Sequence, residues 1–435
     1  MLNIGFISLG CSKNLVDSEH IIALFKDGFR VENDPSKCDV ILINTCGFIL
    51  SAKEEAIDTI LEMAAYKKDR LKKLIVCGCF VQRYFEECKE EFPEVDAFIR
   101  IDDYDRITEI LGEVLEHDFS GCDRNERTLL TPPHFAYLRI ADGCNHRCAY
   151  CAIPGIRGNY VSEPLEKLIE EAKKLSAAGV KELDLIAQDC AYYGRDLYKH
   201  CALSELLVEL DKMDFTWIRM LYLYPEEIDE ELLKTIKNSK HVLPYFDMPV
   251  QYGSDRILRS MRRPTNVKML KEKFALIHSY FNGEETMRTT MMVGFPGEEE
   301  KDFEETMEFV KECRFDSLGA FTYSREEGTP SYDFPDQVEE ELKEERYEKL
   351  MALQQEVVTA KNQQRVGRVY PVLVEQNDPL RRLSYGRAAF AAPEGVDPAL
   401  IIRHAGHLPI GEFVNVKIEK ADAYEFYGSV QEETL

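Results

Sequence analysis

The feature that most constrains the fold is an alternation of short apolar segments with longer charged, amphipathic segments over residues 1–365. The apolar segments have the length and composition of buried strands, and the charged segments have the periodicity of helices that cover a sheet. Strand followed by helix, repeated many times, predicts parallel sheets. We therefore expect an α/β fold for most of the chain.

The pattern divides the chain into three predicted domains. Residues 1–133 end in a polar stretch and a Thr-Pro-Pro linker, and predict an N-terminal parallel-sheet α/β domain. Residues 134–365 contain six candidate strands, which predict a partial (β/α)6 barrel. Residues 366–435 contain short strand-like runs split by Gly, Pro and Asp, which predict a small antiparallel β-barrel. The candidate strands of the first two domains are residues 4–9, 40–44, 74–77, 137–141, 182–187, 218–224, 245–250, 288–293 and 318–323.

The composition limits the compartment and the partners. The chain carries 13 Cys and a net charge of −25, an acidity that favours a basic macromolecular partner over nucleic acid. No basic leader precedes the first strand, and no apolar run reaches the ~18 residues of a membrane span. We therefore expect a cytoplasmic protein without a membrane partner. Disulfides are rare in a reducing cytosol, so the thiols are expected to bind metal or iron–sulfur clusters.

One group of thiols follows the first candidate strand of the barrel. Cys144, Cys148 and Cys151 have the spacing C-x3-C-x2-C, and the active sites of such barrels lie on the loops after the strands. A structural zinc site normally takes four protein ligands, whereas a 4Fe–4S cluster held by three Cys leaves one iron open to a substrate. An open cluster is therefore the functional interpretation. A zinc knuckle or a set of buried thiols is the alternative.

A second group of thiols follows the strands of the N-terminal domain. Cys11, Cys46 and Cys79 each come at the end of a candidate strand, next to a glycine. The carboxyl ends of neighbouring parallel strands form the crevice in which open α/β sheets bind ligands, so we expect these thiols to meet. A second cluster with three protein ligands is the functional interpretation, and unrelated buried thiols are the alternative. Cys77 lies inside an apolar run and is assigned to the core.

The C-x3-C-x-aromatic-C motif resembles the radical S-adenosylmethionine superfamily. The resemblance implies that the open iron chelates the methionine moiety of S-adenosylmethionine, and that an electron from the cluster yields a deoxyadenosyl radical. Such a radical breaks C–H bonds that are too weakly acidic for a protein base. The resemblance also implies that the aromatic Tyr150 lies against the adenine. Further cofactor contacts are expected from Glu182, Gln188 and Gly297, each of which has an ordinary strand-end or turn role as its alternative.

The whole chain is similar to the methylthiotransferases, which join an N-terminal cluster domain, a radical barrel and a TRAM domain. One branch of this family modifies a ribosomal protein, and the other modifies adenosine in tRNA. Residues 9–19, 187–197 and 323–330 resemble the ribosomal-protein branch, although Cys190 stands where Thr is more usual.

Membership of that branch implies a substrate and a reaction. A methylthio group would be added to the β-carbon of an aspartate in small-subunit ribosomal protein twelve, either free or on the assembled subunit. The reaction would use two 4Fe–4S clusters, S-adenosylmethionine, a reducing electron donor and a sulfur donor.

Charge bears on the choice of substrate. The last 70 residues hold 7 Lys and Arg against 10 Asp and Glu, whereas a β-barrel that reads tRNA should carry a basic face. An acidic chain suits a basic ribosomal protein, whose association it would accelerate. tRNA adenosine is the alternative substrate. A cluster-bearing electron carrier or assembly scaffold without catalysis is the third interpretation.

Overall fold

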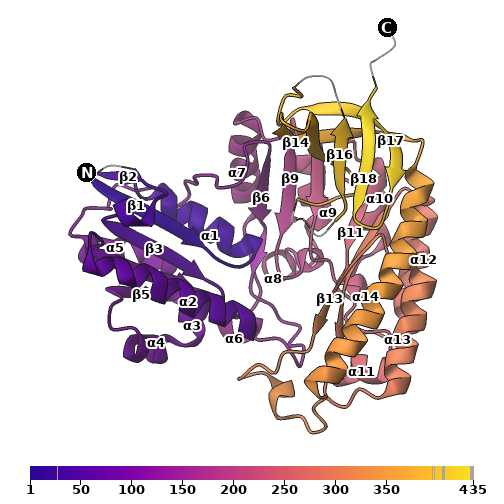
Figure 1. Cartoon of the computed structure of the whole chain (residues 1–435), viewed down its shortest axis with the longest axis horizontal. Helices are drawn as coiled ribbons and strands as arrows, with labels where there is room; N and C mark the ends of the chain where they lie inside the picture. The colour runs from indigo at the N-terminus through magenta and orange to yellow at the C-terminus, as the bar shows by residue number, and fades with distance from the viewer. Residues whose placement is uncertain (27, 394, 396, 404–406, 432–435) are drawn as a thin grey trace. The chain divides into compact units, whose positions relative to one another are not determined.

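The computed structural model describes residues 1–26, 28–393, 395, 397–403 and 407–431. The chain divides into two units (Figure 1). The first unit contains residues 1–132, 142–161 and 324–332, and the second contains residues 133–141, 162–323 and 333–435. Within the part of the chain that the structure describes, none of the helices is long and apolar enough to cross a membrane.

The first unit is built on a five-stranded sheet in which every neighbouring pair is parallel, with the strand order β2-β1-β3-β4-β5. The order reverses between β1 and β3, and ligands of doubly wound sheets bind at such a reversal. The strands are β1 (Leu2–Ser8), β2 (Phe29–Val31), β3 (Val40–Thr45), β4 (Lys73–Gly78) and β5 (Ala97–Ile99).

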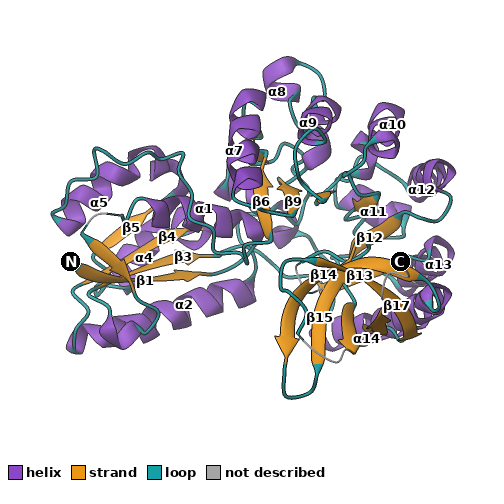
Figure 2. Ribbon diagram, turned by 90° about the horizontal axis from the view of Figure 1, so that it is seen from above, coloured by secondary structure: helices purple, strands orange, loops and turns teal. Residues whose placement is uncertain are grey.

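Helices cover both faces of this sheet, as Figure 2 shows. Side chains of β3 alternate between the two faces, so Val40 and Leu42 pack with α1 and α5, while Ile41 and Ile43 pack with α2 and α4. The helices of the unit are α1 (Ser12–Ala23), α2 (Leu50–Ala65), α3 (Cys79–Arg83), α4 (Phe85–Glu91), α5 (Ile107–Leu115) and α6 (Ile153–Ile156).

The second unit contains the six predicted barrel strands as two parallel sheets, β10-β9-β6 and β11-β12-β13. A parallel bridge between Ile218 and Val242 connects the sheets. These strands are β6 (Phe135–Arg139), β9 (Glu182–Ile186), β10 (Trp217–Met220), β11 (Tyr245–Asp247), β12 (Thr286–Val293) and β13 (Ser317–Thr322). The two-residue strands β7 (Ala141–Asp142) and β8 (Val161–Ser162) lie where the chain passes between the units.

Amphipathic helices connect the barrel strands and bury their apolar stripes. In α7 (Leu165–Ala177), for example, Leu168, Ala172 and Leu175 are buried at helical spacing. The other helices of the unit are α8 (Arg195–Tyr198), α9 (Leu203–Leu210), α10 (Glu230–Asn238), α11 (Asp255–Ser260), α12 (Val267–Phe281), α13 (Glu300–Cys313) and α14 (Glu340–Asn362).

The C-terminal part of the second unit is a closed barrel with the strand order β14-β15-β16-β18-β17. Its pairs are antiparallel except β16 with β18, which are parallel. The strands are β14 (Val369–Asp378), β15 (Leu383–Ala388), β16 (Ala399–Arg403), β17 (Phe413–Ala421) and β18 (Glu425–Val430). The strand-like run expected at residues 399–405 ends in two positions, 404 and 405, that lie outside the described residues.

The closed barrel packs on the amino ends of the parallel strands in the same unit. Trp217, at the start of β10, makes an edge-to-face contact with Phe413 of β17. Tyr245, at the start of β11, donates a hydrogen bond to Asp397 at 2.6 Å. The loops at the carboxyl ends of these strands are therefore on the side away from the closed barrel.

The predicted fold class is confirmed in its three parts: a parallel α/β sheet, six parallel barrel strands and a small closed β-barrel. The short edge strands β2 and β5 were not predicted. The domain boundaries at 133 and 365 stay predictions. The first compact unit contains residues 142–161 and 324–332 together with the N-terminal sheet.

Candidate metal centres

The three cysteines of the N-terminal sheet lie at the carboxyl ends of adjacent strands. Cys11 follows β1 and precedes α1, Cys46 follows β3 directly, and Cys79 follows β4 as the first residue of α3. Since β1, β3 and β4 are neighbours in the sheet, the topology brings the three loops to one edge. That edge is the crevice beside the reversal of strand order.

The three thiols interact electrostatically with one another. Burial raises the pKa of Cys46, and the nearby Cys11 raises it further. Burial raises the pKa of Cys79 to about 12, with added contributions from Cys11 and Cys46 that oppose the effect of Arg157. Three ionised thiols at this edge would therefore be costly without a cation. Metal binding removes the cost because its positive charge favours the thiolate form.

Two glycines allow the thiol loops to approach. Gly10 has φ +90°, and a Cβ there would lie 2.7 Å from Cys46 Cβ. Gly78 has φ +98°, and a Cβ there would lie 2.2 Å from Asn44 Oδ1. A side chain at either position would combine a strained backbone with a clash. The glycines beside Cys11 and Cys79 are thus required by the close approach of the loops.

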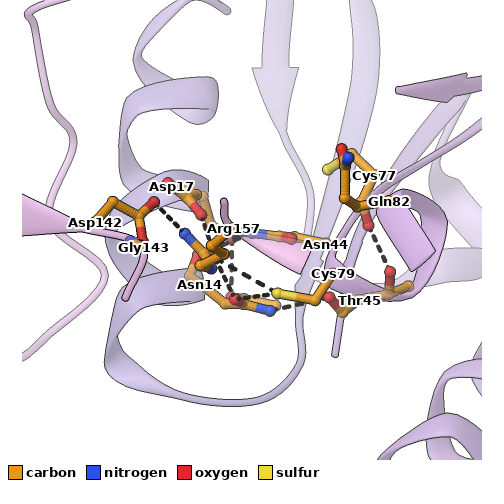
Figure 3. A network of polar contacts seen from close by, with 12 residues as sticks. Asn14, Asp17, Asn44, Thr45, Cys77, Cys79, Gln82, Asp142, Gly143 and Arg157 are labelled. Atoms are coloured by element: carbon orange, nitrogen blue, oxygen red, sulfur yellow. Dashed lines mark hydrogen bonds and ion pairs between the residues drawn. The ribbon is translucent and has the colours of Figure 1, made fainter. Parts of the chain in front are cut away.

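Two asparagines clamp these loops together (Figure 3). Asn14 donates to the carbonyl oxygen of Thr45 at 2.9 Å, and Asn44 donates back to the carbonyl oxygen of Asn14 at 2.8 Å. Thr45 Oγ1 then donates to the carbonyl oxygen of Cys77 at 2.6 Å. The loops that carry the three cysteines are therefore connected by buried hydrogen bonds, which fix their spacing before any ligand binds.

The second group of cysteines lies on a tight loop that folds back on itself within residues 142–161. The amide of Cys144 donates to the carbonyl oxygen of Gly158 at 3.2 Å, and the amide of Cys151 donates to that of Cys148 at 3.1 Å. Gly143 has φ +75°, and a Cβ there would lie 2.1 Å from the carbonyl oxygen of Asn159. Cys144 and Cys148 are buried, and Cys151 is half-buried.

This loop belongs to the same compact unit as the first group of cysteines. Ala152 and Ile156 form a small apolar cluster with Cys79. Arg157 reaches Cys79 Sγ at 3.6 Å, and it also bonds to Asn14 and Asp17 near Cys11 (Figure 3). Two sets of three cysteines that are distant in sequence are therefore parts of one packed assembly.

Residues 324–332, which follow β13 in the chain, complete this assembly. Glu326 forms ion pairs with Lys53 at 2.9 Å and with Arg83 at 3.0 Å. Arg83 also donates to the carbonyl oxygen of Gly47, the residue after Cys46. The amide of Ser331 donates to the carbonyl oxygen of Ala149, the residue after Cys148. Residues 324–332 thus help to fix two backbone carbonyl groups, one beside Cys46 and one beside Cys148.

The two sets have the donor chemistry of iron–sulfur clusters. Among the described residues, there is no group of three or more His, Cys, Asp or Glu side chains that could hold a metal ion. The thiolates of a cubane cluster are arranged differently, because each binds a separate iron and the cluster holds them apart. Three cysteines in each set, together with the mutual electrostatic coupling of Cys11, Cys46 and Cys79, fit clusters of this kind.

Glu182 occupies a different kind of environment from the one predicted. It is the first residue of β9 and is fully buried, and its carboxylate binds Arg219 at 2.8 Å and Arg387 of the closed barrel at 2.6 Å. Burial alone would raise the pKa of Glu182, but Arg387 and Arg219 lower it overall. This position is at the amino end of the strand, where the carboxylate joins two β structures. The structure therefore gives no support to a cofactor contact by Glu182.

The other predicted cofactor residues lie in loops. Gln188 follows the carboxyl end of β9, and Gly297 lies between β12 and α13 with φ +80°. Both backbone groups of Gly297 form hydrogen bonds within the protein: its amide donates to the carbonyl oxygen of Asp336, and its carbonyl oxygen accepts from Arg256. Tyr150 is half-buried within the cysteine loop of the first unit. Their contacts with S-adenosylmethionine stay predictions.

Comparison with known proteins agrees with this architecture. Residues 3–100 match an uncharacterized protein family, UPF0004, residues 138–310 match the radical SAM superfamily, and residues 366–430 match the TRAM domain. Among solved structures, a radical S-adenosylmethionine methyltransferase from Kitasatospora setae, TsrM, is similar with a TM-score of 0.56 at 13% identity over 76% of each chain. The three family matches define a radical S-adenosylmethionine protein with an N-terminal UPF0004 domain and a C-terminal TRAM domain.

Curated relatives identify the family. The chain is 45% identical to the ribosomal protein uS12 methylthiotransferase RimO of Caldicellulosiruptor saccharolyticus, over 99% of this chain and 100% of that protein. It is 44% identical to the protein of the same name from Acetivibrio thermocellus, over 99% of both chains. The chain belongs to the RimO family of methylthiotransferases. Two 4Fe–4S clusters and S-adenosylmethionine, the cofactors predicted from the sequence, are those of this family.

Proposed function

We propose that this protein adds a methylthio group to the β-carbon of an aspartate in ribosomal protein uS12. The observation that carries the proposal is that two separate sets of three cysteines are packed in one compact unit, in a chain 44–45% identical to enzymes named for this reaction. The tRNA adenosine alternative is not favoured, because these relatives are named for a ribosomal protein.

In this proposal the two sets of cysteines have different roles. Cys144, Cys148 and Cys151 would hold the cluster that, with S-adenosylmethionine, supplies the radical chemistry needed to remove hydrogen from an unactivated carbon. Cys11, Cys46 and Cys79 would hold the second cluster, at which the sulfur is supplied. Three protein ligands at each cluster leave one iron for an exogenous group, which four would not.

The protein itself would bind, orient and shield these groups. The Asn14–Asn44 pair fixes the loops of Cys11 and Cys46, and Arg83 with Glu326 fixes the carbonyl group beside Cys46. Cys144, Cys148 and Cys79 are buried, so these three thiolates would be protected from water, whereas Cys11 is exposed. Rigid placement of this kind contributes to catalysis by holding the reacting groups in position.

The reaction needs components that the chain does not provide. We propose that the reaction uses a reducing electron donor and a sulfur donor. A second S-adenosylmethionine would be the source of the methyl group. The substrate would be uS12, free or on the assembled small subunit, and the reaction would take place in the cytoplasm. An overall charge of −25 would favour association with a basic ribosomal protein.

Mass spectrometry of uS12 tests the proposal. In cells that lack the gene, the target aspartate should lose the mass of the methylthio group, and the wild-type gene should restore it. Cys46→Ala and Cys148→Ala should each fail to restore it, whereas Cys88→Ala, a buried thiol on α4, should succeed. An unchanged aspartate mass together with loss of a methylthio nucleoside from tRNA would reject the ribosomal substrate.

A further inference from the structure

We propose that Arg157 is a positioning residue for the second cluster, where it holds Cys79 in place and raises the reduction potential of the bound cluster. The inference rests on the proposed function, since it requires a cluster on Cys11, Cys46 and Cys79. It concerns a residue six positions after Cys151, on the loop of the other set of cysteines. Arg157 would therefore connect the loop that holds one cluster with a ligand of the other.

The guanidinium of Arg157 is fixed on four sides (Figure 3). Nη2 lies 2.7 Å from Asn14 Oδ1, 2.8 Å from Asp17 Oδ2 and 3.6 Å from Cys79 Sγ. Nη1 donates to Asp142 Oδ2 at 2.7 Å. Only 2% of the side chain is exposed. These contacts hold the guanidinium in one orientation. Nη2 has two hydrogens, so the longer contact with the sulfur of Cys79 shares a hydrogen with one of the two oxygen contacts.

The placement has an electrostatic consequence at Cys79. Arg157 Nη2 lies 3.6 Å from Cys79 Sγ, so the positive charge of the guanidinium acts directly on this sulfur. The same charge would stabilise the thiolate that a cluster requires. It would also stabilise the reduced form of the cluster over the oxidised form, because the reduced form is more negative. Hydrogen bonds to the sulfurs and the net charge nearby are the features by which proteins set the potentials of iron–sulfur clusters.

Two aspartates near the cysteines make the reduction potential of the second cluster depend more strongly on Arg157. Asp17 lies on α1 after Cys11, and Asp142 lies two residues before Cys144. With the arginine in place, both carboxylates are paired. Without it, two negative groups would be left near the thiolates, which would disfavour reduction of the cluster further. A neutral residue at position 157 should therefore shift the potential in the negative direction.

Redox titration of the second cluster alone tests the inference. Cys148→Ala removes a ligand of the other cluster, so in that background the remaining iron–sulfur signal after anaerobic reconstitution belongs to Cys11, Cys46 and Cys79. Arg157→Gln should make the reduction potential of the second cluster more negative by at least about 59 mV, which corresponds to a tenfold change in the one-electron reduction equilibrium. Arg157→Lys keeps the positive charge but lacks the planar guanidinium with its several N–H donors. The potential should therefore shift in the same direction by a smaller amount.

Arg127→Gln is the matched control. Arg127 is a buried arginine of the same unit that pairs with Glu19 of α1 at 2.6 Å. Its loss removes a comparable buried ion pair, so it reports the effect of a general loss of stability. The potential of the second cluster should stay at the parent value in this variant. An equal shift in Arg127→Gln and Arg157→Gln would overturn the inference.

The remaining outcomes separate the inference from the proposed function. If the Cys148→Ala parent binds no cluster, the proposed function fails. If the parent binds a cluster and Arg157→Gln has the same potential, the inference fails. If Arg157→Gln loses iron and Arg127→Gln keeps it, the inference is supported, because Arg157 would then be needed to hold Cys79 in place as a ligand. If Arg157→Gln does not fold, Arg157→Lys serves in its place, and an unchanged potential there would also overturn the inference.

Discussion

Arg83 Nη1 donates a hydrogen bond to Glu326 Oε2 at 3.0 Å, in a contact where only 2% of the Glu326 side chain is exposed. Arg83 belongs to α3, which begins at Cys79, and Glu326 belongs to the segment after β13. The same arginine donates to the carbonyl oxygen of Gly47 beside Cys46. Glu326 thus holds the arginine that fixes the backbone next to one of the predicted cluster ligands.

We expect Glu326→Gln to destabilise the first unit by about 3–5 kcal/mol, because it leaves the half-buried Arg83 and Lys53 without their buried counter-charge. The measurement is urea unfolding of the apo protein at pH 7, together with iron content after reconstitution, which should fall. Glu327→Gln changes an exposed neighbour in the same way and should stay within about 0.5 kcal/mol of the parent. Equal stability of the two variants would show that the ion pair does not hold the segment.

We expect Gly78→Ala to disrupt the first set of cysteines. A non-glycine residue at φ +98° and ψ −160° costs about 1–3 kcal/mol, and the clash of the new Cβ with Asn44 and Thr45 adds to this. Both the thermal midpoint and the iron content should fall. Gly121→Ala, which places its Cβ in open space, is the control and should change neither. Normal iron content in Gly78→Ala would mean that the loops tolerate a wider separation.

We expect the Glu182 ion pairs to contribute stability that depends on pH. Arg387 and Arg219 outweigh the effect of burial and lower the pKa of Glu182 from its ordinary value of 4.5. The folded state therefore binds this proton less readily than the unfolded state. The contribution is fully present above about pH 4.5, and it is lost as the pH falls through the lower value of the folded protein.

The measurement is urea unfolding of Glu182→Gln and its parent as apo proteins. At pH 7 the variant should be less stable by about 3–5 kcal/mol, because two buried arginines lose a partner. The difference should narrow as the pH is lowered below 4.5. Glu166→Gln, at an exposed position of α7, should show neither effect. A difference that is constant with pH would contradict the role of the charge.

The sequence was sufficient to predict the features that follow from spacing. Cys11, Cys46 and Cys79 could be placed together because each follows a recognisable strand, and parallel strands end at one edge. The candidate strand at residues 288–293 lies within β12 (Thr286–Val293), because a short apolar run between charged segments marks it in the sequence. The edge strands β2 and β5 were missed because each has three residues, too few for a periodic pattern.

The features that the sequence did not reveal depend on tertiary contacts. Glu182 carries the same carboxylate whether it faces a cofactor or two arginines, and Arg387 lies 205 positions later in the chain. Arg157 was not predicted, because a single arginine in a loop is usually solvated and its four partners lie on three different segments of the chain. Glu326 fell within a stretch used for the family resemblance, yet nothing in its spacing indicated that it pairs with Lys53 and Arg83.

The iron and sulfide content of anaerobically reconstituted protein tests the central claim most directly. Two clusters, each held by its own three cysteines, predict about eight irons in the parent and about four in each of Cys46→Ala and Cys148→Ala. The variant that combines both substitutions should bind almost none. Zinc in place of iron, or a parent with about four irons that either substitution alone abolishes, would contradict the existence of two separate centres.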